Sequence, residues 1–449
     1  MDPQFPHMQS NGIGDRIPDP GYSLHLPTST LLKATPTPNT SIKDYFPFTN
    51  MTPIFRAEQI GSLMRPPELL AVRKAAGVAA PYSQIPKEIH QPTKAAIGTA
   101  VTKQLELGIR PIMSGEYERV VFYSGFFENL AGIEVIKAIP IPEGYRTSFP
   151  TVRILQELEI STRDSIVAVD HICHTHSPYL SEWHALRSLL APEQWRECKL
   201  TMPPVTHGHM QMAKGTAYRA SVYKDDREYF ADLAAAYTAE FRVLYDAGLR
   251  SIQIDDPCLL FFVTDEFRSG CEADGVDPDA LLDLYIWAHN QCLTGKPDDL
   301  HVGLHLCRGN MAGSTHIMSG SYERIAKKMF TELDYDTFYL EYDTDRAGDF
   351  EPLRHLPTGK NVVLGVVSTK SPDMEDIDEL TARVNAAARI IGQGQGRSTA
   401  EVIDTSLGVS PQCGFSSMSA GGGYGVTMER MWEKLLLVKQ LAERIWGNP

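Results

Sequence analysis

Short apolar runs alternate with longer amphipathic stretches from Phe55 to the end of the chain, and this alternation restricts the fold more than any other feature. The strand-length runs are FRAEQIGS, RPIMSGE, LTMPPVTH, SIQIDDP, HVGLHLCRGN, FYLEYD, NVVLGVV and LGVSPQCG. Helices are predicted over residues 92–107, 229–247, 278–292, 322–333, 374–391 and 427–445. A strand–helix pattern repeated this often predicts an α/β fold with a parallel sheet covered by helices.

Polar side chains stand where the predicted strands end, and this placement is a second constraint. These residues are Glu116, Asp255, His305, Cys307, Glu341 and Cys413. In a (β/α)8 barrel the carboxyl ends of all strands meet on one face, which carries the active site. We therefore predict a single (β/α)8 TIM barrel over residues 51–449. Inserted loops would account for its length of roughly 400 residues, compared with about 250 in a typical barrel.

The first 50 residues differ from the remainder of the chain. They are rich in Pro, Ser, Thr and Asn and show no sustained periodicity, which predicts a partly disordered N-terminal extension over residues 1–50. The opening octapeptide MDPQFPHM ends in a second methionine, which suggests a tag-derived segment. Two aspartates, Asp15 and Asp19, and the small number of arginines argue against a transit peptide.

Charge and cysteine content disfavour several classes of protein. Lys and Arg number 42 against 56 Asp and Glu, a formal charge of −14, so nucleic acid and anionic membrane surfaces are not expected partners. No apolar run approaches the ~18 residues needed to span a membrane. The seven cysteines are odd in number and widely scattered, which indicates free thiols in a reducing cytoplasm. The sequence leaves homo-oligomer formation open.

Four of the strand-end residues have the chemistry of a metal site. His305 and Cys307 stand two positions apart, so on an extended segment both side chains point to the same side. With Glu341 and Cys413 they offer one imidazole, two thiolates and one carboxylate, which suits tetrahedral Zn²⁺. The His-x-Cys pair alone is a weak signal, because a hydrogen-bonded core histidine beside a buried thiol gives the same pattern.

Two other histidine groups are weaker candidates. The segment HICHTHS, from His171 onward, is dense in ligand-type residues, but all of them are local in the chain. A surface loop, or a supporting role around a site, is the preferred interpretation of this segment. His207 and His209 follow another predicted strand and are expected in a pocket wall rather than as metal ligands.

Around these residues the chain resembles the cobalamin-independent methionine synthase family, specifically its catalytic C-terminal barrel and the short single-barrel relatives. The matching stretches are RAEQIGSLMRP, MSGEYER, LYDAGLRSIQIDDP, HLCRGN, FYLEYD and LGVSPQCGF. They occur in the family's order from about Phe55 to the C-terminus, so the resemblance covers about nine-tenths of the chain.

The resemblance implies a zinc enzyme that acts on a small thiol, with homocysteine as the default substrate. The implied zinc ligands are His305, Cys307, Glu341 and Cys413. The residues implied to hold the thiol substrate are Ile60, Gly61, Ser62, Glu116 and Asp255. Glu116 and Asp255 are also expected to be catalytic and to pair with a substrate ammonium. A free thiol has a pKa of about 8.5, and zinc coordination would hold it as a nucleophilic thiolate.

The chain departs from the family in two respects that bear on the alkyl donor. Complete members carry a second, N-terminal barrel that helps bind a polyglutamylated folate, and no such half is present. The short relatives are expected to carry R-A-D-H-[IV]-G-S, whereas this chain has Glu58 and Gln59. The expected reaction is therefore zinc-dependent alkyl transfer to a small thiol, with methyl transfer to homocysteine as the default and the donor left open.

Three alternatives follow from the same residues. Addition of a thiol to an epoxide or an activated alkene, as in the epoxyalkane:coenzyme M transferases, would use the same thiolate. A lyase like uroporphyrinogen decarboxylase would share the barrel, would need no zinc and would favour basic residues in its pocket. A non-catalytic zinc-binding scaffold would use the metal for stability alone.

Overall fold

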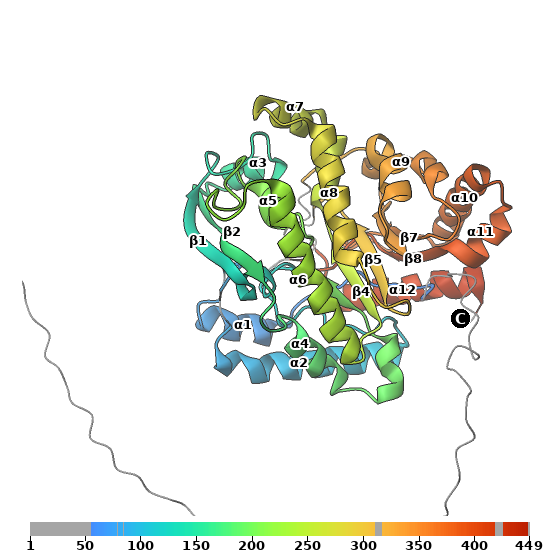
Figure 1. The fold of residues 1–449 in the computed structure, drawn as a ribbon. Coiled ribbons are helices and arrows are strands. Elements are labelled where there is room, and N and C mark those ends of the chain that lie inside the picture. The colour runs from blue at the N-terminus through green and yellow to red at the C-terminus, as the bar shows by residue number, and fades with distance from the viewer. Residues whose placement is uncertain (1–54, 79, 84, 310–316, 418–424, 448–449) are drawn as a thin grey trace, which may run out of the picture. The chain divides into compact units, whose positions relative to one another are not determined.

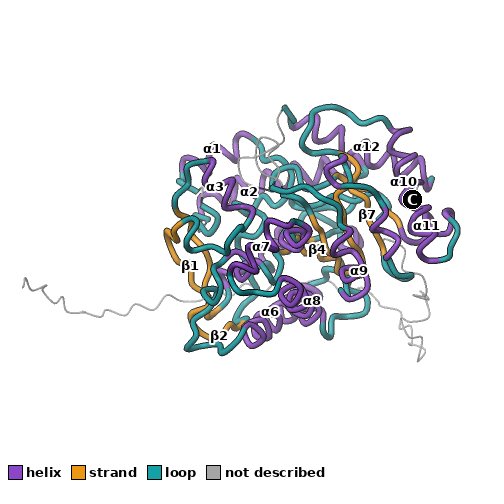
Figure 2. The backbone as a smooth tube through the Cα atoms, turned by 90° about the horizontal axis from the view of Figure 1, so that it is seen from above, coloured by secondary structure: helices purple, strands orange, loops and turns teal. Residues whose placement is uncertain are grey.

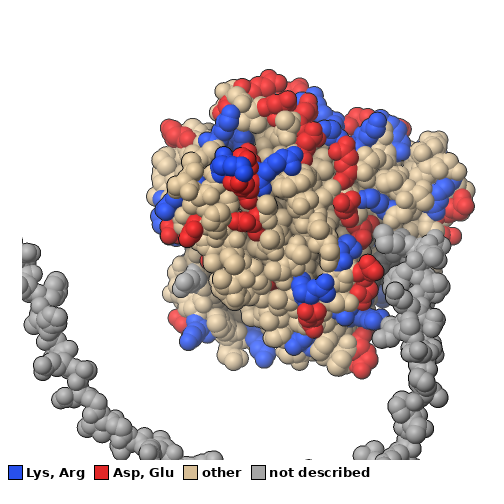
Figure 3. Space-filling view, in the orientation of Figure 1, with Lys and Arg blue, Asp and Glu red and all other residues tan. Residues whose placement is uncertain are grey.

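A computed structural model of the chain describes residues 55–78, 80–83, 85–309, 317–417 and 425–447 (Figure 1). The predicted extension over residues 1–50 lies outside the described residues, so it stays a prediction. Within the described part, no helix has the length and apolar character needed to cross a membrane. On the face drawn in Figure 3, basic and acidic side chains are interspersed rather than gathered in one basic patch.

A six-stranded parallel sheet forms the core, in the order β3-β4-β5-β6-β7-β8. Its strands are β3 (Leu200–Met202), β4 (Ser251–Asp255), β5 (His301–Leu306), β6 (Thr337–Glu341), β7 (Asn361–Val367) and β8 (Leu407–Pro411). Every residue of β4, β6, β7 and β8 is buried. Burial on both faces explains why these strands read as nearly continuous apolar runs, since helices cover a parallel sheet on its outer side.

Two further segments continue this sheet at its edges. At one edge, Ala57 forms a parallel bridge with Val409 of β8. At the other edge, Ile112 forms a parallel bridge with Cys198, which lies just before β3. These segments correspond to the first two predicted strands, FRAEQIGS and RPIMSGE. Gly61 and Gly115 have positive φ, a conformation that ends extended pairing. The parallel α/β sheet is confirmed, whereas the regular ladder among the described residues has six strands rather than the eight of a closed barrel.

The helical layer follows the predicted pattern. The α-helices are α1 (Pro67–Ala75), α2 (Lys87–Leu107), α3 (Pro150–Glu157), α4 (Leu180–Arg187), α5 (His207–Gln211), α6 (Asp226–Asp246), α7 (Asp265–Ala273), α8 (Pro278–Leu293), α9 (Glu323–Glu332), α10 (Ile377–Gln395), α11 (Thr399–Ser406) and α12 (Met428–Trp446). Short 3₁₀ helices are η2 (Phe127–Asn129), η3 (Pro192–Glu197), η4 (Cys258–Val263), η6 (Asp345–Ala347) and η7 (Glu351–His355). Figure 2 shows strands β4 and β7 inward of helices α8, α9 and α10.

Side-chain caps explain where several of these helices begin. The carboxylates of Asp225, Asp277 and Asp376 accept backbone N–H groups at the first turns of α6, α8 and α10. Ser398 does the same for α11, where Glu401 completes a capping box. Each cap satisfies donors that the helix cannot satisfy itself.

An antiparallel hairpin outside the main sheet was not predicted from the sequence. It pairs β1 (Ala131–Pro140) with β2 (Thr162–Cys173), and α3 lies between the two strands in the chain. Exposed and half-buried positions make up most of both strands, and β-bulges interrupt their register. The hairpin packs against α5 and α6, which places it next to the segment that follows β3.

Candidate functional site

A backbone carbonyl on the neighbouring strand orients the His305 ring for metal binding. It lies within β5, opposite Asp255 of β4 in the parallel register. Its Nδ1 donates a hydrogen bond of 3.1 Å to the carbonyl oxygen of Tyr339 on β6. Because a carbonyl only accepts, Nδ1 carries a proton, and Nε2 is the nitrogen left to bind a metal. Nε2 is buried and has no hydrogen-bond partner among the described residues.

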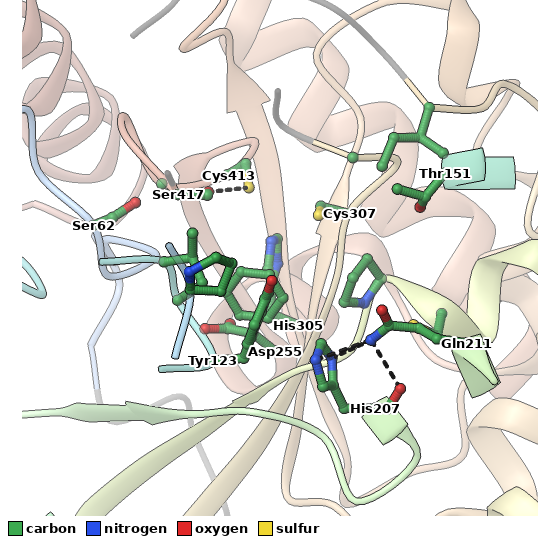
Figure 4. Close-up of a pocket in the computed structure, with 18 of the residues that line it drawn as sticks. Ser62, Tyr123, Thr151, His207, Gln211, Asp255, His305, Cys307, Cys413 and Ser417 are labelled. Carbon is green, nitrogen blue, oxygen red and sulfur yellow. Dashed lines mark hydrogen bonds between the residues drawn. The ribbon is translucent and has the colours of Figure 1, made fainter. Parts of the chain in front are cut away.

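Two cysteine sulfurs complete a cluster with this nitrogen. The ligand atoms of His305, Cys307 and Cys413 all lie within 4.8 Å of one another, and all three residues are buried. Cys307 directly follows β5 and Cys413 lies just beyond β8, so strands that are not neighbours supply the cluster (Figure 4). Tetrahedral Zn²⁺ with bonds of about 2.0–2.3 Å needs its ligands only slightly closer than this. The residues present therefore fit the metal.

The thiols interact with each other and with the imidazole. A hydrogen bond from Cys413, followed by the influence of His305, holds the pKa of the Cys307 thiol well below its usual range. The same hydrogen bond and burial raise the pKa of Cys413. These opposite shifts favour ionisation of Cys307 before Cys413, and a soft cation such as Zn²⁺ would favour the thiolate form of both.

Glu341 lies close to this cluster but has other partners. The last residue of β6, it is fully buried, and its Oε2 accepts a hydrogen bond of 2.7 Å from the backbone N–H of Arg308. Its Oε1 accepts from the guanidinium of Arg346. Burial raises the pKa of Glu341, and the charge of Arg346 opposes this shift. The structure thus brings three of the four predicted ligands together, and Glu341 stays a predicted ligand.

The residues predicted to hold the thiol substrate meet at a second point. Glu116 adopts a left-handed φ of 59°, and its Oε1 accepts a hydrogen bond of 2.7 Å from Thr201. A Cβ atom at Gly61 would lie 2.7 Å from that same oxygen, so only glycine allows the approach. Gln253 donates to the carbonyl oxygen of Ile60 at 3.1 Å and to Asp255 at 2.6 Å. Gln253 therefore holds Ile60 and Asp255 together, and Glu116 lies against the neighbouring Gly61.

The carboxyl groups of Glu116 and Asp255 favour the binding of a cation between them. Oε2 of Glu116 is buried without a hydrogen-bond partner among the described residues. Burial raises the pKa of Glu116, and it raises the pKa of Asp255 to about 7 despite the opposing effect of His305. Each carboxyl group also raises the cost of ionising the other. An ammonium group between them would allow both to ionise.

One cavity of about 290 Å³ joins the two groups of residues. The predicted site residues that line it are Ile60, Ser62, Glu116, Asp255, His305, Cys307 and Cys413. Figure 4 shows the sulfurs of Cys307 and Cys413 on one side of this cavity, with His305, Asp255 and Tyr123 below them. Ser62 Oγ also accepts the backbone N–H of Ser416 at 3.2 Å, which ties this wall to the segment carrying Cys413.

Comparisons with known proteins identify the family of this chain. A family model described as the cobalamin-independent synthase catalytic domain matches residues 182–421. The uncharacterized protein YxjH of Bacillus subtilis is 31% identical over 397 residues, covering 87% of this chain and 95% of YxjH. The chain belongs to the cobalamin-independent methionine synthase family.

Two further comparisons relate this family member to a protein of known structure and to a longer enzyme. The crystal structure of a putative vitamin-B12-independent methionine synthase from Listeria monocytogenes superposes with a TM-score of 0.62 at 25% identity, covering 88% of this chain and 98% of the other. The 5-methyltetrahydropteroyltriglutamate–homocysteine methyltransferase of Bacillus velezensis is 23% identical over 292 residues, which cover 64% of this chain but only 32% of that enzyme. This family member therefore matches a part of the longer enzyme.

Several of the other histidines of this family member contact side chains elsewhere in the same chain. His171 contacts Asp232 at 2.9 Å, and His174 contacts the buried carboxylate of Glu240 at 2.7 Å. Among the described residues, the only cluster able to hold a metal is that of His305, Cys307 and Cys413. His207 lines the cavity as predicted, whereas His209 pairs with Tyr285 and Asp226.

Sequence reasoning missed part of the cavity wall. Thr201, which holds Glu116, and Arg163, at the start of β2, were not singled out. The apolar wall residues Phe122 and Tyr123 were also missed, although they follow Glu116 in the run EYERVVFYSGFF. Aromatic residues directly after a predicted strand-end carboxylate were the available signal for these two, and nothing comparable marks Arg163.

Proposed function

We propose that this protein is a zinc-dependent thiol alkyltransferase, with methyl transfer to homocysteine or a similar small thiol as the default reaction. The observation that carries the proposal is the unpartnered Nε2 of His305 beside two sulfurs in a cavity that also contains Glu116 and Asp255. We also infer that the segments around Ala57 and Ile112 complete a (β/α)8 barrel, since each bridges one edge of the sheet.

The ligands fit a metal that activates sulfur rather than water. Zn²⁺ held by one imidazole and two thiolates, with Glu341 as a fourth ligand, would lower the pKa of a thiol that binds to it. Glu341 is the hardest donor of the four, and Arg346 already competes for it. A carboxylate with an alternative partner is the ligand most easily displaced when substrate sulfur arrives.

The chain's own residues would orient the thiol substrate. Glu116 and Asp255 would bind its ammonium group, and the turn at Gly61 and Ser62 would face its carboxylate. The metal would hold the substrate sulfur as a thiolate, with its proton released to water, and this sulfur would attack the alkyl carbon of the donor. The S–C bond forms while the bond from carbon to the leaving group breaks, and the leaving group keeps the electron pair. Addition to an epoxide would use the same thiolate, with ring opening as the bond-breaking event.

A decarboxylase function is disfavoured by the charges in the cavity. Such a lyase is expected to hold its acidic substrate with several basic residues. Among the described residues that line the cavity, Arg163 is the only Lys or Arg, and the same lining contains two carboxylic acids, Glu116 and Asp255. A strongly anionic substrate would therefore be repelled near the cysteines.

A spectroscopic titration tests the proposed function. Metal-free protein loaded with Co²⁺ is expected to bind one ion per chain and to show sulfur-to-cobalt charge-transfer absorption. Addition of homocysteine should increase this absorption, because a further sulfur joins the ion. Cobalt bound without any response to homocysteine, cysteine, glutathione or coenzyme M would contradict the proposal and favour a structural metal.

The charge of Glu116 should matter only for substrates that carry an ammonium group. We expect Glu116→Gln to weaken homocysteine binding about 10- to 100-fold, because a charge-assisted hydrogen bond is lost in a buried site. Binding of 4-mercaptobutyrate, which lacks the ammonium, should change little. Both affinities can be read from the cobalt absorption. Equal losses for the two thiols would show that Glu116 has a structural role instead.

A further inference from the structure

The cavity extends beyond the thiol site into a largely aromatic region, which we call the outer chamber. Its apolar lining residues are Phe122, Tyr123, Phe149, Leu155, Ile160 and Phe261. Five of them precede residues 182–421, which the family model matches, and three of these five lie between β1 and β2 in the chain. The outer chamber is therefore built largely by the part of the chain that the family model does not match.

Arg163 places one positive charge in the outer chamber. It lies at the start of β2 and lines the cavity. Its guanidinium donates to the hydroxyl of Tyr123 and lies 5.9 Å from the centre of that ring. Within the described part of the chain, no carboxylate forms an ion pair with Arg163, whereas the nearby Arg119 is paired with Glu182 at 2.8 Å. A cation without a counter-ion in a half-buried position favours an incoming anion.

The neighbours of Arg163 supply hydrogen bonds without further charge. The hydroxyl of Tyr145 is buried and has no hydrogen-bond partner among the described residues. His207 is neutral, since burial lowers its pKa to about 3, and its ring contacts Gln211 at 2.9 Å and the Tyr82 hydroxyl at 3.3 Å. Among its described lining residues, the outer chamber thus presents a single cation with the hydroxyl of Tyr123, the amide of Gln211 and aromatic faces around it.

We propose that the outer chamber binds the alkyl donor, and that this donor is a compact molecule with a flat apolar body and one carboxylate held by Arg163. This inference rests on the proposed thiol chemistry. The fork of a guanidinium matches a carboxylate, and aromatic walls favour a flat apolar body. A polyglutamylated donor would bring several carboxylates, and the described lining offers only one cation to receive them.

The transfer balances with such a donor. The alkyl carbon is bonded to a leaving heteroatom of the donor and faces the substrate sulfur. As the S–C bond forms, the bond from carbon to the heteroatom breaks and the heteroatom keeps the electron pair. The carboxylate stays paired with Arg163 throughout, so it positions the donor and takes no part in bond making.

Two small probes test this inference on the full-length, zinc-loaded protein without any thiol. 4-Methylbenzoate carries the carboxylate, and 4-methylbenzamide has nearly the same shape without the charge. Calorimetric titration should show that the wild type binds 4-methylbenzoate and that Arg163→Gln weakens this binding at least about tenfold. Affinity for the amide should be unchanged in the variant, which also shows that the chamber is intact. Lys137→Gln is the matched control, because Lys137 lies on the same hairpin, exposed and paired with Asp164.

The outcomes separate this inference from the proposed function. Failure of the wild type to bind 4-methylbenzoate, or binding that Arg163→Gln leaves unchanged, would overturn it. Loss of homocysteine binding in Arg163→Gln, seen in the cobalt absorption, would also overturn it, because Arg163 would then serve the thiol. Binding of 4-methylbenzoate that depends on Arg163, with a cobalt spectrum that no thiol alters, would support the anion site and reject only the thiol chemistry.

Discussion

Cys413→Ser and His305→Ala are each expected to lose tightly bound metal and to lower alkyl transfer by more than about a hundredfold. A partner that merely orients a metal ligand is worth about 10- to 100-fold when it is removed, and these residues are expected to be the ligands themselves. Metal content after dialysis against a chelator, measured by mass spectrometry, and the rate of product formation from homocysteine check this result. Full activity in either dialysed variant would show that the ligand assignment is wrong.

A matched control separates loss of the metal from loss of the fold. Cys258 lines the same cavity but is not part of the metal-competent cluster. Cys258→Ala should therefore keep its metal, and its unfolding can be compared with that of Cys413→Ser by circular dichroism. If Cys258→Ala lost metal as completely as Cys413→Ser, metal loss would report disruption of the cavity rather than removal of a ligand.

The second large effect is expected inside the sheet, at the ion pair between Lys199 and Glu58. Lys199 Nζ lies 2.6 Å from Glu58 Oε2, and both side chains are almost completely buried. The ammonium also lies 4.3 Å from the centre of the Tyr339 ring. Lys199→Met would leave the carboxylate of Glu58 buried without its counter-ion. We expect it to lower the free energy of unfolding by about 3–5 kcal/mol, as measured by urea denaturation.

The double variant Lys199→Met/Glu58→Leu tests the reason for that loss. Replacing both charges with apolar groups of similar size removes the stranded carboxylate, so most of the lost stability should return. If the double variant were as unstable as the single one, the loss would come from packing around Lys199 and not from an unpaired charge. Metal binding should persist in the folded double variant, because neither residue lines the cavity.

Strands were predicted correctly where the local sequence pattern reflects the burial of the strand in the folded protein. Runs such as NVVLGVV are apolar throughout because β7 is buried on both faces, and this property is visible in the sequence. His305 and Cys307 could be predicted to point to the same side because strand geometry alone fixes the direction of residues two apart. Nothing local connects β5 with β8, so Cys413 could be joined to this pair only through its position at a strand end, and the resemblance to a family supported that grouping.

The features missed from the sequence depend on contacts between distant segments. The first two predicted strands shrink to single bridges because Gly61 and Gly115 turn the chain so that Glu116 can approach Thr201. The partner of Glu341 could not be foreseen, because Arg346 lies in the short 3₁₀ helix η6, whose direction only the folded chain defines. The ladder between β1 and β2 carries two register shifts, which weakens the alternation that marks a hairpin.

The bridge between Ala57 and Val409 has a consequence for folding during synthesis. The segment that carries the wall of the thiol site near Ile60 is synthesised long before its partner in β8, which precedes Cys413. No nascent or truncated chain that stops before β8 can assemble the site. Until β8 emerges, the edge around Ala57 stays open to wrong pairing, a period in which a chaperone would be of use.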